Sequence, residues 1–136
     1  MKRGLLFSYQ MLTGLSDTST GVLLILAPAW TLHLMRLQQI PNTLPFLSFI
    51  GAFVLSVGIA CLYGAVLAHR AASLPKLEVV WLLTAVTRAM VAVLIVAKTL
   101  SGALETGWTI VAVSDGAFAL LQTIGLAKGW LSEAAA

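Results

Sequence analysis

The sequence predicts an all-α fold, a four-helix transmembrane bundle that runs up, down, up and down. Three observations predict it: the composition, four long apolar windows and the short connections between them. Of the 136 residues, 60% are hydrophobic and 10% are charged, whereas a soluble domain has about 25% charged and about 45–50% apolar residues. Polar residues are therefore too few to cover a water-soluble fold of this size, and the surface is expected to face lipid.

Four windows are long and apolar enough for spanning helices, which need about 20 residues each. They cover about residues 6–31, 46–68, 79–99 and 108–128. The connections are QQIPNTLP (38–45), HRAASLPK (69–76) and SGALETG (101–107). Their proline, asparagine, glycine and serine residues are typical of turns. Because these connections are short, we expect consecutive helices to be antiparallel neighbours in one domain that covers residues 1–136.

The lysine and arginine residues predict the orientation of the chain. One side of the expected bundle holds five of them: Lys2, Arg3, Arg70, Lys76 and Lys128. The opposite side holds Arg36 and Lys98. Since cytoplasmic loops are enriched in lysine and arginine, we expect both termini in the cytoplasm of a bacterial inner membrane. The same scattered distribution excludes a nucleic-acid-binding surface, which needs clustered basic residues.

Arg88 lies inside the third window, at a depth of roughly 13 Å. An ionised side chain at that depth costs at least about 2.5–3.5 kcal/mol and is expected to face a partner. Asp17 in the first window and Asp115 in the fourth lie roughly 12–20 Å from the same membrane edge. We therefore expect an Asp17–Arg88–Asp115 cluster that joins three helices. Neutral polar side chains are expected to extend it: Thr84, Thr87, Ser114 and Gln122.

Two roles are open for this cluster: buried polar interactions that hold the helices together, or a site for a ligand or a proton. Because one arginine meets two carboxylates, the cluster has either a net negative charge or a shared proton. A third arrangement has no cluster. In it, residues 1–15 lie on the membrane surface, SDTST caps a helix, and the first span covers 18–36. Pro28 would then fall in mid-span, and we therefore prefer the arrangement with the first span at about 6–31 and a charged cluster.

Small side chains follow one another at every fourth position of the second window. They are Ala52, Ser56, Ala60, Gly64 and Ala68. Such a ridge lets a neighbouring backbone approach closely, which favours helix association in lipid. We expect the ridge to pack against another helix of this chain, with a further subunit as the alternative.

Several chemistries are excluded by what the sequence lacks. Its lone cysteine, Cys61, allows no disulfide within the chain, no CxxC redox pair and no thiolate zinc site. His33 and His69 flank opposite membrane faces, so they do not ligate one haem together. We find no phosphate-binding loop, HExxH stretch or nucleophile–base pair. The chain is therefore predicted to be non-catalytic, with no metal and no cofactor, while a quinone or a lipid stays open as a ligand.

Four stretches appear in a characteristic order. They are GLSDTSTGVLLILAP, FIGAFVLSVGIACLYGA, TRAMVAVLIV and VSDGAFALLQTIGL. In this order the chain resembles the small DoxX-like four-helix membrane families. The resemblance implies a compact four-helix membrane fold and, in some relatives, association with quinone-linked oxidoreductases. It carries over no catalytic residue, but Asp17, Arg88 and Asp115 match positions where these families tend to be polar.

Two functions follow as expectations. The first is a non-catalytic accessory or structural subunit of a larger bacterial membrane complex, respiratory or quinone-linked. The alternative is a small binding or transport module for a quinone, a lipid or a small ion, using the charged cluster. The expected partners are the lipid bilayer and other membrane subunits or a second copy of the chain.

Overall fold

The computed structural model describes residues 3–37, 44–70 and 73–135, and these ranges contain helices and no strand. The long helices are α1 (Arg3–Leu26), α3 (Leu44–Ala68), α4 (Leu74–Leu100) and α5 (Thr109–Ala127). The short elements are α2 (Pro28–Leu34), the 3-10 turn η2 (Thr106–Trp108) and α6 (Trp130–Ala135). Lys2 and parts of the connections expected at 38–45 and 69–76 lie outside the described residues.

Three helices of the described chain are long and apolar enough to cross a membrane. They are Leu44–Ala68, Leu74–Leu100 and Thr106–Ala127. The protein is therefore helical and fits a membrane environment. Helix α1, with 24 residues, is as long as a span but lies outside this set because polar residues interrupt it.

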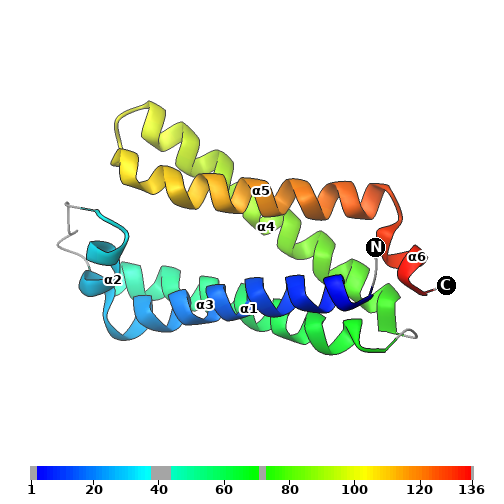
Figure 1. Ribbon diagram of the computed structural model, residues 1–136. Helices are drawn as coiled ribbons and strands as arrows, with labels where there is room; N and C mark the ends of the chain where they lie inside the picture. Colours follow the sequence, from blue (N-terminus) through cyan, green and yellow to red (C-terminus); the bar gives the residue numbers. More distant parts are fainter. Residues whose placement is uncertain (1–2, 38–43, 71–72, 136) are drawn as a thin grey trace.

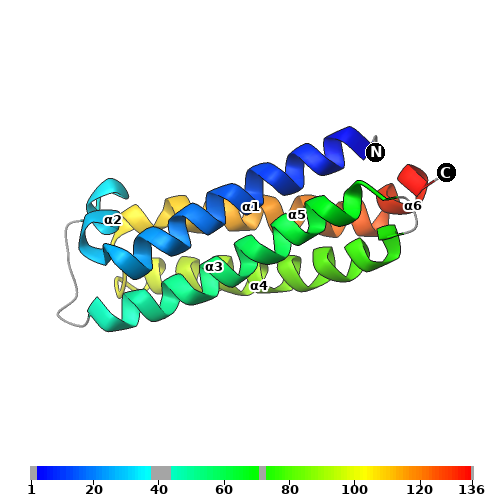
Figure 2. The same ribbon diagram turned by 90° about the horizontal axis from the view of Figure 1, so that it is seen from below.

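The four long helices form two antiparallel pairs (Figure 1). Helix α1 packs along α3, α5 packs along α4, and α4 crosses against α3 to join the pairs. The start of α1 lies at the same end of the molecule as α6, while α2 and η2 lie at the other end (Figures 1 and 2). Each pair therefore keeps its own interface, and the groups between the pairs hold the molecule together.

Pro28 divides the first expected window. Helix α1 ends at Leu26, and Ala27, with φ −142° and ψ 60°, leads into α2 with Pro28 at its first position. A proline lacks the N–H of a helix interior but fits the first turn. Within α1 the helix is continuous across Ser16–Thr20, so SDTST caps no helix. Residues 3–15 belong to the same helix as Asp17.

Glycines bring the backbones of α1 and α3 into close contact. A Cβ atom added to Gly58 of α3 would lie 2.4 Å from the backbone nitrogen of Thr18 on α1. One added to Gly21 of α1 would lie 2.5 Å from the backbone nitrogen of Leu55 on α3. Such distances are too short for real side chains, so these positions require glycine. In a membrane this close approach favours packing, because dispersion holds the helices together.

The ridge expected at every fourth position of α3 is only partly buried. Ala52 and Ser56 are exposed, Ala60 is half-buried, and Gly64 and Ala68 are buried. The structure thus corrects the expectation for the first half of the ridge, which does not pack against another helix of this chain.

Helical geometry explains this difference. At about 100° per residue, a four-residue step turns about 40° past a full turn, so a long ridge winds around the helix. A seven-residue step falls about 20° short of two turns and stays on one face for longer. Gly51 and Gly58 of α3, and Gly14 and Gly21 of α1, follow the seven-residue spacing, and all four are buried.

Apolar clusters close both ends of the molecule. At the end that holds α6, the buried residues are Leu6, Leu67, Ala68, Leu74, Leu77, Trp81 and Leu131. At the end that holds α2, they are Leu32, Leu37 and Leu47. Asp17 of α1, Arg88 of α4 and Asp115 of α5 lie between these clusters, in the middle part of their helices.

Gly58→Ala is expected to destabilise the protein by about 1–3 kcal/mol, because the methyl group would overlap the backbone of Thr18. The measurement is the unfolding midpoint in mixed detergent micelles, read by circular dichroism. Gly116→Ala is the matched control, since a Cβ atom there would lie 3.8 Å from Ala92, an ordinary contact, and alanine favours a helix. Equal midpoints for Gly58→Ala and the unmodified protein would contradict the close approach.

Candidate functional site

Arg88 joins three helices through two ion pairs. From α4, its Nη1 donates to Oδ1 of Asp115 on α5 at 2.7 Å. Its Nη2 donates to Oδ2 of Asp17 on α1. Arg88 is 3% exposed and belongs to the buried face of α4. The structure thus brings together the three charged residues that the sequence singled out.

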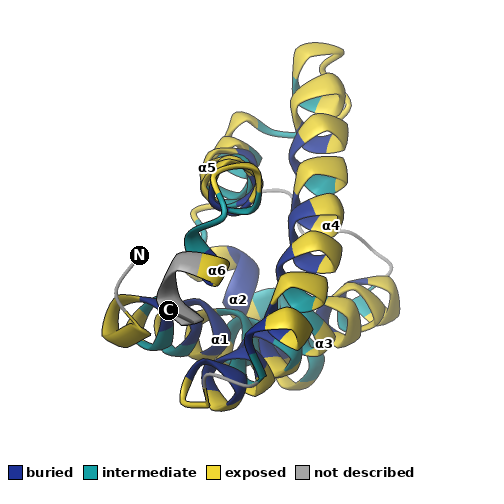
Figure 3. Cartoon of the chain, turned by 90° about the vertical axis from the view of Figure 1, so that its right-hand side faces the viewer, coloured by how far each residue is buried: buried dark blue, intermediate teal, exposed yellow. Residues whose placement is uncertain are grey.

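The carboxylates of this cluster are more accessible than its guanidinium. The side chain of Arg88 is 4% exposed, against 18% for Asp17 and 19% for Asp115. Helices α1 and α5, which carry these aspartates, share no extensive interface. Their ribbons stand apart on one side of the molecule, whereas α4 meets α3 on the other side (Figure 3). The partial exposure of both carboxylates gives access to the cluster.

The charges of the cluster do not balance when all three groups are ionised. One guanidinium faces two carboxylates, which leaves one negative charge. Each aspartate accepts from a different nitrogen of the same side chain, so the two acidic groups are held close together. Like charges held this close favour the uptake of a proton or of another cation.

One aromatic ring lies against Arg88, and rings from two other helices connect to it. The guanidinium carbon of Arg88 lies 5.0 Å from the ring centroid of Phe118 on α5, in cation–π geometry. Tyr9 on α1 makes edge contacts with Phe118 at 6.0 Å and with Trp81 of α4 at 5.6 Å. The arginine is therefore held by an aromatic face as well as by two carboxylates.

The rings were not anticipated from the sequence, although their spacing carries a signal. Phe118 follows Asp115 by three positions, and Trp81 precedes Arg88 by seven, so each shares a helix face with a charged residue. Aromatic residues are frequent in apolar helices, and the spacing alone does not distinguish a contact with the cluster from ordinary packing.

Gln122 and Thr84 form a second polar link between α4 and α5. The Nε2 atom of Gln122 donates to Oγ1 of Thr84 at 2.9 Å, and Thr84 donates to the carbonyl of Val80 at 2.8 Å. Both side chains are buried. Thr84 lies one turn before Arg88 on the same face of α4. These two expected members of the cluster therefore lie beside it and bond to each other.

Ser114 and Thr87 do not join the cluster. Both are exposed; Ser114 donates to the carbonyl of Val111 at 3.0 Å, and Thr87 donates to the carbonyl of Leu83 at 3.0 Å. Their hydroxyl groups bond to the backbone of their own helix, a common arrangement in apolar surroundings. The expectation for Ser114 was wrong because a neighbour of Asp115 in sequence points about 100° away from it around the helix.

Gln10 is a buried polar residue that sequence reasoning missed. It is 0% exposed, and neither amide atom has a hydrogen-bond partner among the described residues. Its Nε2 is so close to Gly64 that a Cβ atom there would lie 2.0 Å from it. Gln10 precedes Asp17 by seven residues and shares its face of α1. The buried face of α1 thus contains, besides Asp17, an amide side chain without a hydrogen-bond partner among the described residues.

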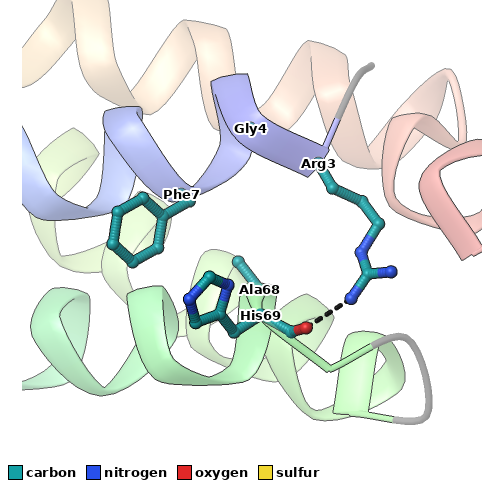
Figure 4. Close-up of a pocket in the computed structure, with 5 residues that line it drawn as sticks. All are labelled: Arg3, Gly4, Phe7, Ala68 and His69. Atoms are coloured by element: carbon teal, nitrogen blue, oxygen red, sulfur yellow. Dashed lines mark hydrogen bonds between the residues drawn. The ribbon is translucent and has the colours of Figure 1, made fainter.

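A separate cleft of about 380 Å³ lies at the end of the molecule where α1 begins (Figure 4). It is lined by Arg3, Gly4, Phe7, Ala68 and His69. Arg3 donates to the carbonyl of His69, and the His69 ring stacks on Phe7 at 5.0 Å. None of the charged trio lines this cleft, so the cluster stays the candidate site.

The described residues contain no group of three or more histidine, cysteine, aspartate or glutamate side chains that would hold a metal ion. Comparison of the chain with family models, with curated proteins and with solved structures finds no match. The resemblance to DoxX-like families thus stays an expectation from the sequence, and the role of the site rests on its own geometry.

Arg88→Ala is expected to lower the free energy of unfolding by about 3–5 kcal/mol, because two partly buried carboxylates would lose their partner. Lys98→Ala, at an exposed position of the same helix, is the control and should stay within about 0.5 kcal/mol. The triple variant Asp17→Asn, Arg88→Met, Asp115→Asn should recover part of the loss, since it removes all three charges. A triple variant less stable than Arg88→Ala would contradict this account.

Proposed function

We propose that the protein is a small, non-catalytic membrane module that binds a positively charged ligand at the Asp17–Arg88–Asp115 cluster. One observation carries the proposal: two carboxylates share one buried guanidinium, and each carboxylate is about a fifth exposed. A purely structural pair would need one carboxylate, and sealing both from the surroundings would strengthen it. The extra, accessible negative charge is the property expected of a cation site.

This charge also ranks the ligands that the sequence left open. A quinone or a neutral lipid presents carbonyl oxygens. These oxygens and the ionised carboxylates are all hydrogen-bond acceptors, so the two aspartates attract such ligands poorly. A cation neutralises the excess charge and removes the repulsion between the carboxylates. A cation is therefore the ligand class that the cluster favours.

We further propose that α1 is a fourth span and that both termini lie in the cytoplasm of a bacterial inner membrane. At 1.5 Å per residue α1 is about 36 Å long, enough for the hydrocarbon core of about 30 Å. Its polar Gln10 and Thr13 are buried. Large apolar residues on its outside would face lipid: Leu5, Leu12, Leu15, Val22 and Leu26. Inward-facing polar groups explain why α1 is less apolar than the other spans.

Asp115→Asn is the sharpest test, because it leaves Arg88 paired one-to-one with Asp17 and so keeps the fold. We expect the variant to lose at least about 90% of the cation flux or cation binding measured with the purified protein in liposomes, starting with protons as the smallest cation. Ser114→Ala, next to it on the exposed side of α5, should behave like the unmodified protein. Full activity of Asp115→Asn would overturn the proposed function.

A second candidate function is an accessory subunit of a larger membrane complex. It is favoured by the first half of the small-residue ridge, since Ala52 and Ser56 are exposed on α3 beside the exposed rings of Phe49 and Phe53. Exposed small side chains of this kind allow the backbone of another membrane helix to approach. As the sequence analysis expects, the partner would be a subunit of a respiratory or quinone-linked complex.

Ser56→Leu is expected to reduce the recovery of a co-purifying subunit by more than half in mild detergent, because the larger side chain would hold a partner helix away. Ser19→Leu, at an exposed position of α1, is the control. The measurement is native mass spectrometry of protein purified from its own membrane. A monodisperse lone chain in both the unmodified protein and the variant would reject the subunit role.

A further inference from the structure

Arg88 shows which kind of cation suits this site. Its guanidinium is planar and delocalised and is less strongly hydrated than an ammonium group. It lies against the face of Phe118 and bonds to two carboxylates. The combination of an aromatic face with carboxylates stabilises a poorly hydrated organic cation, because both interactions strengthen when water is excluded.

The aromatic surface extends beyond one ring. Phe118, Tyr9 and Trp81 come from α5, α1 and α4, and edge contacts through Tyr9 join them. Phe118 and Tyr9 are both half-buried, so each keeps some accessible surface. An organic cation at the two aspartates would therefore contact apolar ring surface that a small inorganic ion does not use.

An inorganic cation finds fewer suitable ligands here. Hard cations such as Ca²⁺ take six to eight oxygen ligands, and Mg²⁺ takes about six. Within the described chain, no group of three or more histidine, cysteine and acidic side chains is arranged to hold a metal ion, and the two carboxylates of the cluster already accept from Arg88. An organic cation needs no such oxygen shell.

The bonds of Arg88 leave room for exchange. Its two ion pairs use different guanidinium nitrogens and different aspartates, so one pair can open while the other remains. If one aspartate turns to a ligand, Arg88 keeps the other and remains neutralised. The aspartates, 18% and 19% exposed against 4% for Arg88, are the accessible members of the cluster.

We infer that the ligand of this site is a hydrophobic organic cation with a delocalised or shielded charge, of the guanidinium or quaternary onium class. Asp17 and Asp115 bind its charge, and Phe118 binds its apolar part. The inference rests on the proposed function and names the ligand class. It adds Phe118 as a ligand-contacting residue.

Tetraphenylphosphonium is a suitable probe, with neutral triphenylphosphine oxide to measure partition into detergent. We expect saturable binding of the cation to the purified full chain, by equilibrium dialysis, and none of the neutral compound. Phe118→Leu removes the ring and keeps an apolar side chain, so binding should weaken about tenfold. Phe118→Tyr should retain binding. Phe46→Leu, an exposed ring on α3, is the control and should leave binding unchanged.

The outcomes separate this inference from the proposed function. Proton or alkali-cation binding that depends on Asp115, without any saturable phosphonium binding, would overturn the inference and keep the proposed function. If the unmodified protein shows no cation binding or flux that Asp115→Asn abolishes, both are overturned. Phosphonium binding that is equal in unmodified protein, Phe118→Leu and Asp115→Asn would be partition only and would also overturn the inference. If Phe118→Leu fails to fold, binding to the unmodified protein decides, since acidification must displace the phosphonium when carboxylates hold it.

Discussion

A guanidinium among apolar helices must have its charge compensated, and the rest of this structure depends on that requirement. Arg88 lies 3% exposed on α4, and its two bonds reach α1 and α5. Removing water from an ion raises its free energy by several kcal/mol unless partners are close. The arrangement of three helices around Arg88 therefore follows from electrostatics, while apolar packing alone would permit many arrangements of smooth helices in lipid.

Different interactions hold different helix interfaces together: close packing joins α1 to α3, and charged and aromatic groups join α1 to α5. Glycines let α1 and α3 approach so closely that added Cβ atoms would overlap the opposite backbone, as at Gly58 and Thr18. No comparable interface joins α1 to α5; there, Arg88 and the ring contact between Tyr9 and Phe118 make the connection. The carboxylates of this polar connection stay partly exposed, and this is the property on which the proposed ligand binding rests.

The sequence predicted the position of each site residue along its helix axis but not its rotation about that axis. Depth along each helix is proportional to residue number, so Asp17, Arg88 and Asp115 were matched by depth, and the structure places them in contact. Residue number does not show which face of a helix meets a neighbouring helix. Ser114 was therefore assigned to the cluster although it faces outward, and Gln10 and Phe118 were missed although they share a face with an aspartate.

The sequence by itself determined the helical class, the fit to a membrane environment and the position of each charge along its helix, because these follow from composition, window length and rise per residue. Tertiary structure decided which faces meet. A ridge of small residues at every fourth position winds around α3, so Ala52 and Ser56 end exposed while Gly51 and Gly58 are buried. Pro28 ended α1 earlier than the apolar window did. The physical reason is that helix rotation and tilt minimise a free energy shared by all neighbours, which no single segment contains.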